Sequence, residues 1–158
     1  MTISLPEEDR SYLSKRYLED QIVALLGGRV AEKLVLGDIS TGASNDIQRA
    51  SQIAHKMVAV YGMSDKIGTV SFESGHDEVF IGRTMSQGRS YSEQVAAEID
   101  EEVKSIVSRA YARCEEILQA NRDILKTVAE YLLRHETMDR EAFLSVFGEA
   151  VPPVGAEK

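Results

Sequence analysis

Asp46 is the position in this chain where residue type and spacing best suit chemistry. It lies in residues 40–47 (STGASNDI). This segment begins with residue types that break or cap helices, and apolar residues at helical spacing follow it. On a helix that turns about 100° per residue, Asp46 projects close to Ala50, Ile53 and Met57, inside the apolar arc. A carboxylate there must be solvated, paired, or bound to a positive group. Spacing alone favours a simpler interpretation, in which Asp46 complements the positive end of the helix dipole.

Other self-contained catalytic machinery is missing from the sequence. There is no glycine-rich phosphate loop, no Gly-x-Ser-x-Gly and no Cys-x-x-Cys. Residues 135–139 (HETMD) superficially match the His-Glu-x-x-His of zinc proteases, but the fifth residue is Asp139 and the segment falls at a predicted helix end. We therefore expect no metal there. His55 lies opposite Asp46 around the predicted helix, so the two cannot hold one ion, and we interpret His55 as a solvent-side residue.

The composition indicates one soluble globular domain. The 158 residues are 43% hydrophobic and 28% charged, which is ordinary for this class. No apolar run reaches the roughly 18–20 residues needed to span a bilayer. The formal net charge of −8 argues against a nucleic-acid surface, because that would need clustered Lys and Arg. The single Cys114 excludes an intrachain disulfide, and its place in an apolar helical stripe predicts a small core residue.

Helices must position these residues, because the sequence is poor in proline and its apolar residues recur at steps of three and four. We predict a mainly α fold, a helical bundle of about five helices with a short β-hairpin and an N-terminal edge strand. Gly27 and Gly28 interrupt the first helical pattern and predict either a break or the close approach of another backbone. Five helices are predicted, at residues 7–36, at 46–61, from a Ser90 capping box to 120, from an Asn121 cap to 135 and from a Thr137 cap to 148. The predicted strands are an edge strand at residues 2–5 and a hairpin of 69–73 and 78–82. Residues 151–158 are predicted to be a flexible tail.

Several motifs occur in an order that resembles the FtsH family. They are residues 27–32 (GGRVAE), 40–47 (STGASNDI), 61–64 (YGMS), 67–68 (IG) and 79–83 (VFIGR), followed by the capped helix from Ser90. Together they cover nearly the whole chain. Members of this family are membrane-anchored, ATP-dependent zinc metalloproteases. The resemblance therefore implies that the full-length protein is a zinc metalloendopeptidase that degrades membrane and cytosolic proteins.

The resemblance also implies a role for Asp46. In the family, Zn2+ is held by two histidines of a His-Glu-x-x-His helix and by an aspartate further along the chain, which maps onto Asp46. Zinc with three protein ligands keeps an open position for water. Glu32 is the rival carboxylate, and we rank it behind Asp46 as a residue that supports the ligands. No catalytic residue is assigned in this chain, because the general base and both histidines are expected upstream of it.

The same resemblance implies what surrounds this part of the protein. We expect residues 1–150 to be a truncated zinc-peptidase domain, with the strand at residues 2–5 beside the active-site cleft. The AAA module with its ATP and Mg2+, and the transmembrane anchor, would lie upstream. The full-length enzyme would be a homo-hexamer in the inner or plasma membrane, with this domain facing the cytoplasm and polypeptides as substrates. The fragment itself would be soluble and inactive.

One alternative comes from a different functional class. On this interpretation the chain is a helical subunit-interaction module, used for oligomerisation and without a catalytic role. The densely charged long helix after Ser90 would mediate the contact. The two interpretations are compatible, since the family forms rings.

Overall fold

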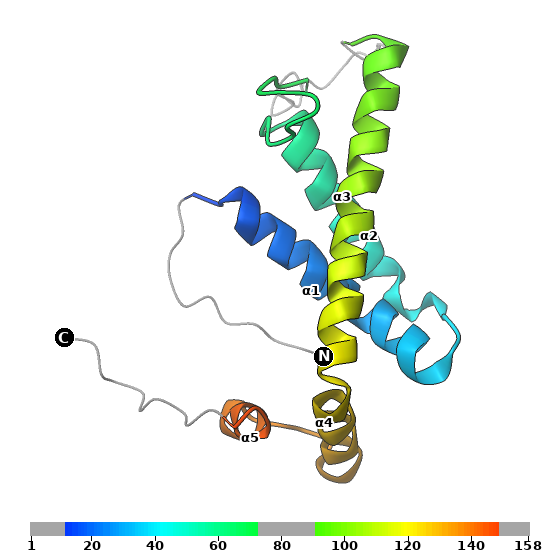
Figure 1. Cartoon of the computed structure of the whole chain (residues 1–158), viewed down its shortest axis with the longest axis vertical. Coiled ribbons are helices and arrows are strands. Elements are labelled where there is room, and N and C mark those ends of the chain that lie inside the picture. Colours follow the sequence, from blue (N-terminus) through cyan, green and yellow to red (C-terminus); the bar gives the residue numbers. More distant parts are fainter. Residues whose placement is uncertain (1–11, 73–90, 149–158) are drawn as a thin grey trace, which may run out of the picture. The chain divides into compact units, whose positions relative to one another are not determined.

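Five α-helices make up most of the described chain (Figure 1). The computed structural model describes residues 12–72 and 91–148. Within these ranges the helices are α1 (Lys15–Leu36), α2 (Ser44–Ala59), α3 (Glu93–Ala120), α4 (Arg122–His135) and α5 (Arg140–Val146), and a 3₁₀ turn, η1 (Thr41–Ala43), precedes α2. The predicted mainly α fold with about five helices is confirmed. The chain divides into two compact units, residues 1–114 and 115–158, with the boundary inside α3.

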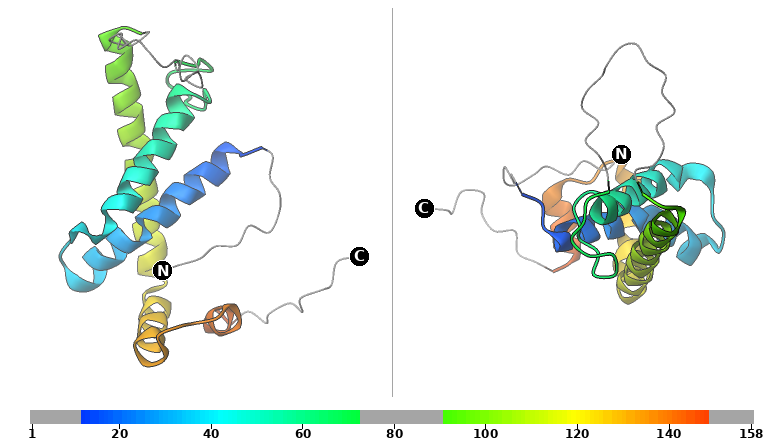
Figure 2. Two further views of the ribbon diagram at one scale, coloured as in Figure 1. Left: turned by 180° about the vertical axis from the view of Figure 1, so that it is seen from behind. Right: turned by 90° about the horizontal axis from the view of Figure 1, so that it is seen from above.

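The first unit is built on a hairpin of α1 and α2, which residues 37–43 connect (Figure 2). Both helices and the first part of α3 turn one apolar side inward, as their spacing predicts. The buried residues are Leu18, Ile22, Leu26 and Val30 on α1, Ala50, Ala54, Met57, Val58 and Ala59 on α2, and Ala96, Ile99, Ile106, Ala110 and Cys114 on α3. Burial of this apolar surface is the main term that stabilises the unit. Cys114 is buried as predicted, and desolvation raises the pKa of its thiol.

Helix α1 begins later than the sequence pattern predicts. Residues 12–14 are described and are not helical, so the predicted continuous helix from residue 7 is wrong. Ser14 is extended, with φ −78° and ψ 155°, and its side chain accepts a hydrogen bond from the backbone N–H of Tyr17 at 3.2 Å. This cap satisfies one of the donors that a first turn leaves unpaired. The helix therefore starts at Lys15, directly after this cap, and its first buried residue is Leu18.

Gly27 and Gly28 do not break α1, which continues through both. Within the described residues, a Cβ built on either glycine has no atom of another segment within 4 Å. Neither of the two predicted explanations, a break or a close backbone, is therefore met in this part of the chain. The two glycines leave a stretch of helix backbone without side chains.

Residues 60–72 form an irregular turn after α2. The backbone N–H of Phe72 donates to the carbonyl of Ala59 at 2.8 Å, so the segment folds back onto the end of the helix. Gly62 permits this path because its φ is +59°, in the left-handed region that favours glycine. A Cβ at Gly62 would lie 3.0 Å from the Cα of Thr69. The turn is therefore closed by tight backbone packing.

This turn replaces the first strand of the predicted β-hairpin. Within residues 12–72 and 91–148, the β pairing consists of one isolated antiparallel bridge, between Ser64 and Gly68. The predicted strand at 69–73 is therefore wrong over residues 69–72, because Phe72 bonds to the last residue of α2 and the backbone at Thr69 and Val70 lies close to Gly62 of the same turn. Three further predicted segments lie outside the described residues: the second hairpin strand (78–82), the edge strand (2–5) and the tail (151–158).

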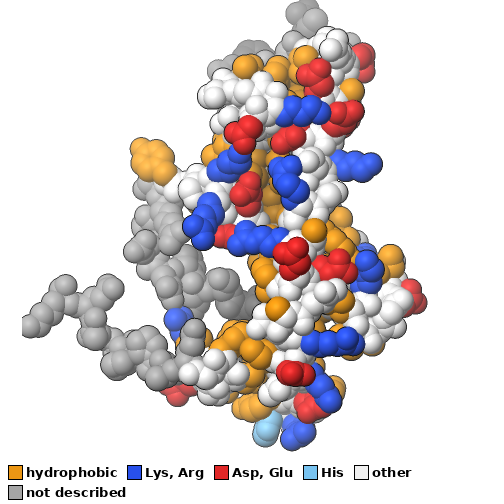
Figure 3. Space-filling model, viewed as in Figure 1, with side chains coloured by type: hydrophobic (Ala, Val, Ile, Leu, Met, Phe, Trp, Pro, Cys, Tyr) orange, Lys and Arg blue, Asp and Glu red, His pale blue; other side chains and the backbone are white. Residues whose placement is uncertain are grey.

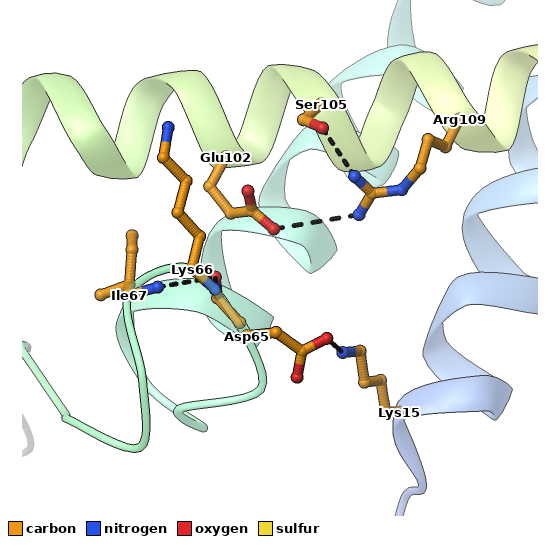
Figure 4. Close-up of polar contacts among 8 residues, drawn as sticks. Lys15, Asp65, Lys66, Ile67, Glu102, Ser105 and Arg109 are labelled. Atoms are coloured by element: carbon orange, nitrogen blue, oxygen red, sulfur yellow. Dashed lines mark hydrogen bonds and ion pairs between the residues drawn. The ribbon is translucent and has the colours of Figure 1, made fainter.

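Two consecutive residues of the turn form ion pairs with different helices. Lys15 Nζ, at the start of α1, lies 3.0 Å from a carboxylate oxygen of Asp65 (Figure 4). Lys66 Nζ lies 2.9 Å from a carboxylate oxygen of Glu101 on α3. Ser64 directly precedes them in the sequence, and its buried side chain accepts hydrogen bonds from the backbone N–H groups of Lys66 and Ile67, at 3.2 Å each. Both ion pairs are exposed and therefore contribute little free energy to folding.

The second unit contains the end of α3 and the helices α4 and α5. Asn121 precedes α4, but its side chain makes no capping bond; its Nδ2 donates to the carbonyl of Ile117 at 2.8 Å. Asp139 caps α5, where its carboxylate accepts from the N–H of Ala142 at 2.8 Å. Asn121 therefore occupies the predicted N-cap position of α4 without making a side-chain cap, whereas the predicted cap at Thr137 is wrong, because Asp139 caps α5. Asn121 has φ −115° and ψ 30°, which is not the extended geometry of an N-cap, whereas Asp139 is extended.

The visible surface carries acidic and basic side chains side by side (Figure 3). None of the helices that the described residues form has the length and apolar character required of a membrane span. Such a mixed surface is typical of helices solvated on one side.

Candidate metal-ligand region at the start of helix α2

Asp46 lies in the first turn of α2, on the side of that helix that carries its buried residues. Ala50 follows one turn later and Met57 three turns later, and both are fully buried, while Asp46 is half-buried. Across residues 12–72 and 91–148, no hydrogen bond or ion pair engages the Asp46 carboxylate. The helix dipole compensates its charge in part. A half-buried anion without a neutralising side chain is a suitable ligand for a cation.

The rival carboxylate, Glu32, is fully engaged near the end of α1. Its Oε1 accepts a hydrogen bond from the Ser40 hydroxyl at 2.8 Å, and its Oε2 accepts one from the Ser40 backbone N–H at 3.3 Å. These two bonds, the hydroxyl bond first, hold the pKa of Glu32 below its ordinary value of 4.5. Glu32 therefore joins the end of α1 to the connecting loop. Its two oxygens already have partners, unlike those of Asp46.

Ser40 also bonds to the turn that precedes α2. Its hydroxyl oxygen accepts a hydrogen bond from the backbone N–H of Gly42 at 3.2 Å, which caps η1. Helix α2 follows η1 without a break, and its own N-cap position, Ala43, has no side-chain cap. The hydrogen bonds that hold the start of α2 therefore come from the loop before it.

An open hollow lies beside the same loop. It is lined by Arg29, Ile39, Ser40, Thr41, Ser44 and Ile47. The lining offers one guanidinium and three hydroxyl groups next to two aliphatic side chains, and it contains no carboxylate. Its chemistry is therefore that of a polar ligand surface and not that of a metal site.

The remaining candidate ligands are not brought together. Within the described ranges, no group of three His, Cys, Asp or Glu side chains is arranged to hold a metal ion. Helix α4 ends at His135, Glu136 has φ +61°, and Asp139 begins the next helix as its cap. The segment 135–139 therefore does not lie on one continuous helix face, which the His-Glu-x-x-His arrangement requires.

The part played by Ser40 is the feature that sequence reasoning missed. The pattern identified Ser40 as a cap former, but the bond to Glu32 links residues eight positions apart across a helix end. No helical or strand spacing pairs such residues. The only available signal was the presence of a hydroxyl residue shortly after a predicted helix that ends in a carboxylate-bearing turn.

Comparison with known proteins places the chain in a family. It matches the model of Peptidase family M41 over residues 1–146. It is 54% identical over 151 residues to the ATP-dependent zinc metalloprotease FtsH 2 of Alkaliphilus metalliredigens, covering 95% of this chain and 22% of that protein. It is 53% identical over 154 residues to the ATP-dependent zinc metalloprotease FtsH 1 of Thermoanaerobacter sp., covering 97% and 25%. The ATP-dependent zinc metalloprotease FtsH of Bacillus subtilis is 48% identical over 140 residues, covering 88% and 22%. The chain thus spans at most a quarter of the length of these relatives, and it belongs to peptidase family M41, as its resemblance to FtsH proteins predicts.

Proposed function

We propose that this chain is part of the proteolytic domain of an ATP-dependent zinc metalloendopeptidase and that Asp46 supplies one zinc ligand. The observation that carries the proposal is the half-buried Asp46 carboxylate, which has no partner among the described residues. The names of the relatives, ATP-dependent zinc metalloproteases, support the same chemistry. Asp46 is then a ligand whose companions are two histidines from outside these 158 residues.

A single carboxylate fits a zinc site as one of three protein ligands. Zinc held in this way, with an open position, would supply Lewis-acid activation of water for attack on a peptide carbonyl. The residues of this chain hold and orient that carboxylate, since Ala50 and Met57 fix the buried side of α2. No general base is assigned to this chain, because the resemblance assigns that role to the glutamate of the His-Glu-x-x-His helix.

The wider activity extends the same proposal. Polypeptides are the substrates, and an AAA module with ATP and Mg2+ drives them into a homo-hexameric ring. A transmembrane segment anchors the enzyme in the inner or plasma membrane, with the peptidase domain facing the cytoplasm. The family resemblance supports these parts, and the names of the relatives support only the dependence on ATP.

The test compares two conservative substitutions in the full-length enzyme. Asp46→Asn keeps the shape of the side chain and removes its charge, so we expect it to weaken zinc binding and proteolysis much more than Glu32→Gln does. Asp123→Asn is the matched control, because Asp123 also lies in the first turn of a helix and experiences the same dipole. Zinc affinity is measured by chelator competition, and proteolysis with an unfolded protein substrate. Equal losses for Asp46→Asn and Asp123→Asn, or a larger loss for Glu32→Gln, would contradict the assignment.

The purified 158-residue chain offers a second test. We expect no peptidase activity from it when zinc is added, because one carboxylate cannot hold catalytic zinc. Activity that a chelator abolishes and zinc restores would overturn this expectation.

A second candidate function, subunit interaction, is favoured by the second unit. Helices α4 and α5 bury no side chain within the described residues, and Leu133, Phe143 and Phe147 are exposed. The rings of Phe143 and Phe147 lie together, with centroids 5.1 Å apart, and exposed apolar patches are typical of interaction surfaces. If α4 and α5 carry a self-association surface, native mass spectrometry of the chain will show oligomers that Leu133→Glu dissociates. A monomer at all concentrations would count against it.

A further inference from the structure

The position of Asp46 depends on how the first turn of α2 is held. That helix has no side-chain cap of its own, and the residue before it, Ala43, is 7% exposed and anchored in the core. The preceding 3₁₀ turn is held by Ser40, which accepts from Gly42 N–H at 3.2 Å. Asp46 follows Gly42 by about one helical turn, so a shift of η1 would move the carboxylate with it.

One side chain, that of Glu32, holds Ser40 at both its hydroxyl and its backbone N–H. The Glu32 carboxylate accepts a hydrogen bond from the Ser40 hydroxyl at 2.8 Å and another from the Ser40 backbone N–H at 3.3 Å. Because the hydroxyl donates to Glu32, its oxygen lone pairs are left to accept from Gly42. A hydroxyl group can donate and accept through the same oxygen atom, and alanine at this position could do neither. The order Glu32, Ser40, Gly42 is therefore a directed chain of hydrogen bonds from the last turns of α1 to the start of α2.

Gly42 fits closely against this chain. A Cβ built on it would lie 3.3 Å from the Ser40 hydroxyl oxygen and 3.7 Å from a carboxylate oxygen of Glu32. The first distance is tighter than an ordinary van der Waals contact, so a side chain at this position would press on the hydrogen-bonded pair.

We propose that Glu32 and Ser40 are positioning residues, which set the direction in which the first turn of α2 presents Asp46 to zinc. The inference rests on the proposed function, because it takes Asp46 as the ligand. Neither positioning residue touches the metal. Their contribution is preorganisation of the helix start. Loss of a contact made directly to a metal ligand typically weakens metal affinity about 10–100-fold, so we expect the lower end of this range for these indirect contacts.

The experiment measures zinc affinity in the full-length enzyme by chelator competition, together with the visible absorption spectrum of the cobalt-substituted form, which reports ligand geometry. Glu32→Ala and Ser40→Ala should each raise the zinc Kd about tenfold and change the cobalt spectrum. Ser40→Thr should retain the wild-type Kd, because threonine keeps the hydroxyl and the backbone at φ −112° and ψ 174° suits a β-branched residue. Glu19→Ala is the control for removal of a glutamate from α1.

The Asp46→Asn background separates positioning from a general structural effect. If Glu32 acts through Asp46, Glu32→Ala will add no further loss of affinity once Asp46 has been replaced. The same tenfold loss in that background would overturn the inference, as would an unchanged Kd for both Glu32→Ala and Ser40→Ala in the otherwise wild-type enzyme. An unchanged Kd for Asp46→Asn alone would instead overturn the proposed function.

A second measurement keeps the inference falsifiable if Glu32→Ala does not fold. Ser40→Ala retains the backbone bond to Glu32 and loses only the hydroxyl bonds, so it is the milder change. Hydrogen exchange of the zinc-free enzyme should then show faster exchange at Gly42, with protection at Met57 unchanged. Unchanged exchange at Gly42 would contradict the hydrogen-bond chain.

Discussion

Replacement of Gly62 by alanine should destabilise the chain more than the same replacement at Gly37. Both glycines have positive φ, +59° at Gly62 and +69° at Gly37. Alanine in this left-handed region costs about 1–2 kcal/mol at either position. The two sites differ in their surroundings, since a Cβ at Gly37 has nothing within 4 Å, whereas one at Gly62 meets the turn.

The extra cost at Gly62 follows from which atoms are close. The added Cβ would lie 3.0 Å from Thr69 Cα, 3.2 Å from Thr69 C and 3.2 Å from Val70 N. All three are backbone atoms, which cannot rotate away as a flexible side chain would. Overpacking of this kind costs about 1–3 kcal/mol. We therefore expect Gly62→Ala to lower the free energy of unfolding by about 2–5 kcal/mol, against about 1–2 kcal/mol for Gly37→Ala.

Urea unfolding of the purified chain, followed by circular dichroism, measures this difference. The free energies of unfolding of the two variants are compared with one shared m-value, the dependence of this free energy on urea concentration. Hydrogen exchange at the Phe72 amide provides a local readout, because its bond to Ala59 closes the turn. A loss for Gly62→Ala no larger than that for Gly37→Ala would refute the argument that backbone contact adds to the strain.

Three further predictions concern the helices and the loop between α1 and α2. Gly28→Ala should raise the free energy of unfolding by about 0.5–1 kcal/mol, because alanine favours helix and its Cβ meets nothing within 4 Å; a lower thermal midpoint would contradict this. Met57→Ala should lower it by about 2–5 kcal/mol in urea unfolding, because Met57 is fully buried, whereas Leu133→Ala, at a side chain 86% exposed, should change it by less than about 0.5 kcal/mol. The stability difference between the chain and Ser40→Ala should be present at pH 7 and shrink as the pH falls below 4.5. The reason is that Ser40 lowers the pKa of Glu32, so the stability from the charged form is lost as pH falls through the folded-state pKa; a difference that grows in acid would contradict this sign.

Helical periodicity predicted the side of α2 on which Asp46 lies, because the rotation per residue of a helix is fixed. It did not predict where α1 begins. Tyr12 and Leu13 continue the apolar pattern, yet Tyr12 is 92% exposed, so these side chains lie on no buried face. The serine cap at Ser14 determined the helix start, and the acidic residues after Pro6 misled the prediction.

The polar contacts of the loop could not be predicted from spacing. Gly37 turns the chain at the end of α1 with φ +69°, and this turn brings Ser40 back to Glu32. The pairing thus depends on one backbone angle and on the path of several loop residues. A similar reason explains the wrong strand at residues 69–72, where β-forming residue types were overridden by packing against the end of α2.

Salt will weaken some of the contacts that hold the turn after α2 and leave others unchanged. Asp65 and Lys66 have opposite charges and hold α1 and α3 respectively through exposed ion pairs, which dissolved salt screens together. The two hydrogen bonds to buried Ser64 and the close packing at Gly62 involve no charge and are unaffected. Residues 60–72 therefore have two electrostatic attachments that weaken in concentrated salt, around an uncharged centre that keeps its shape.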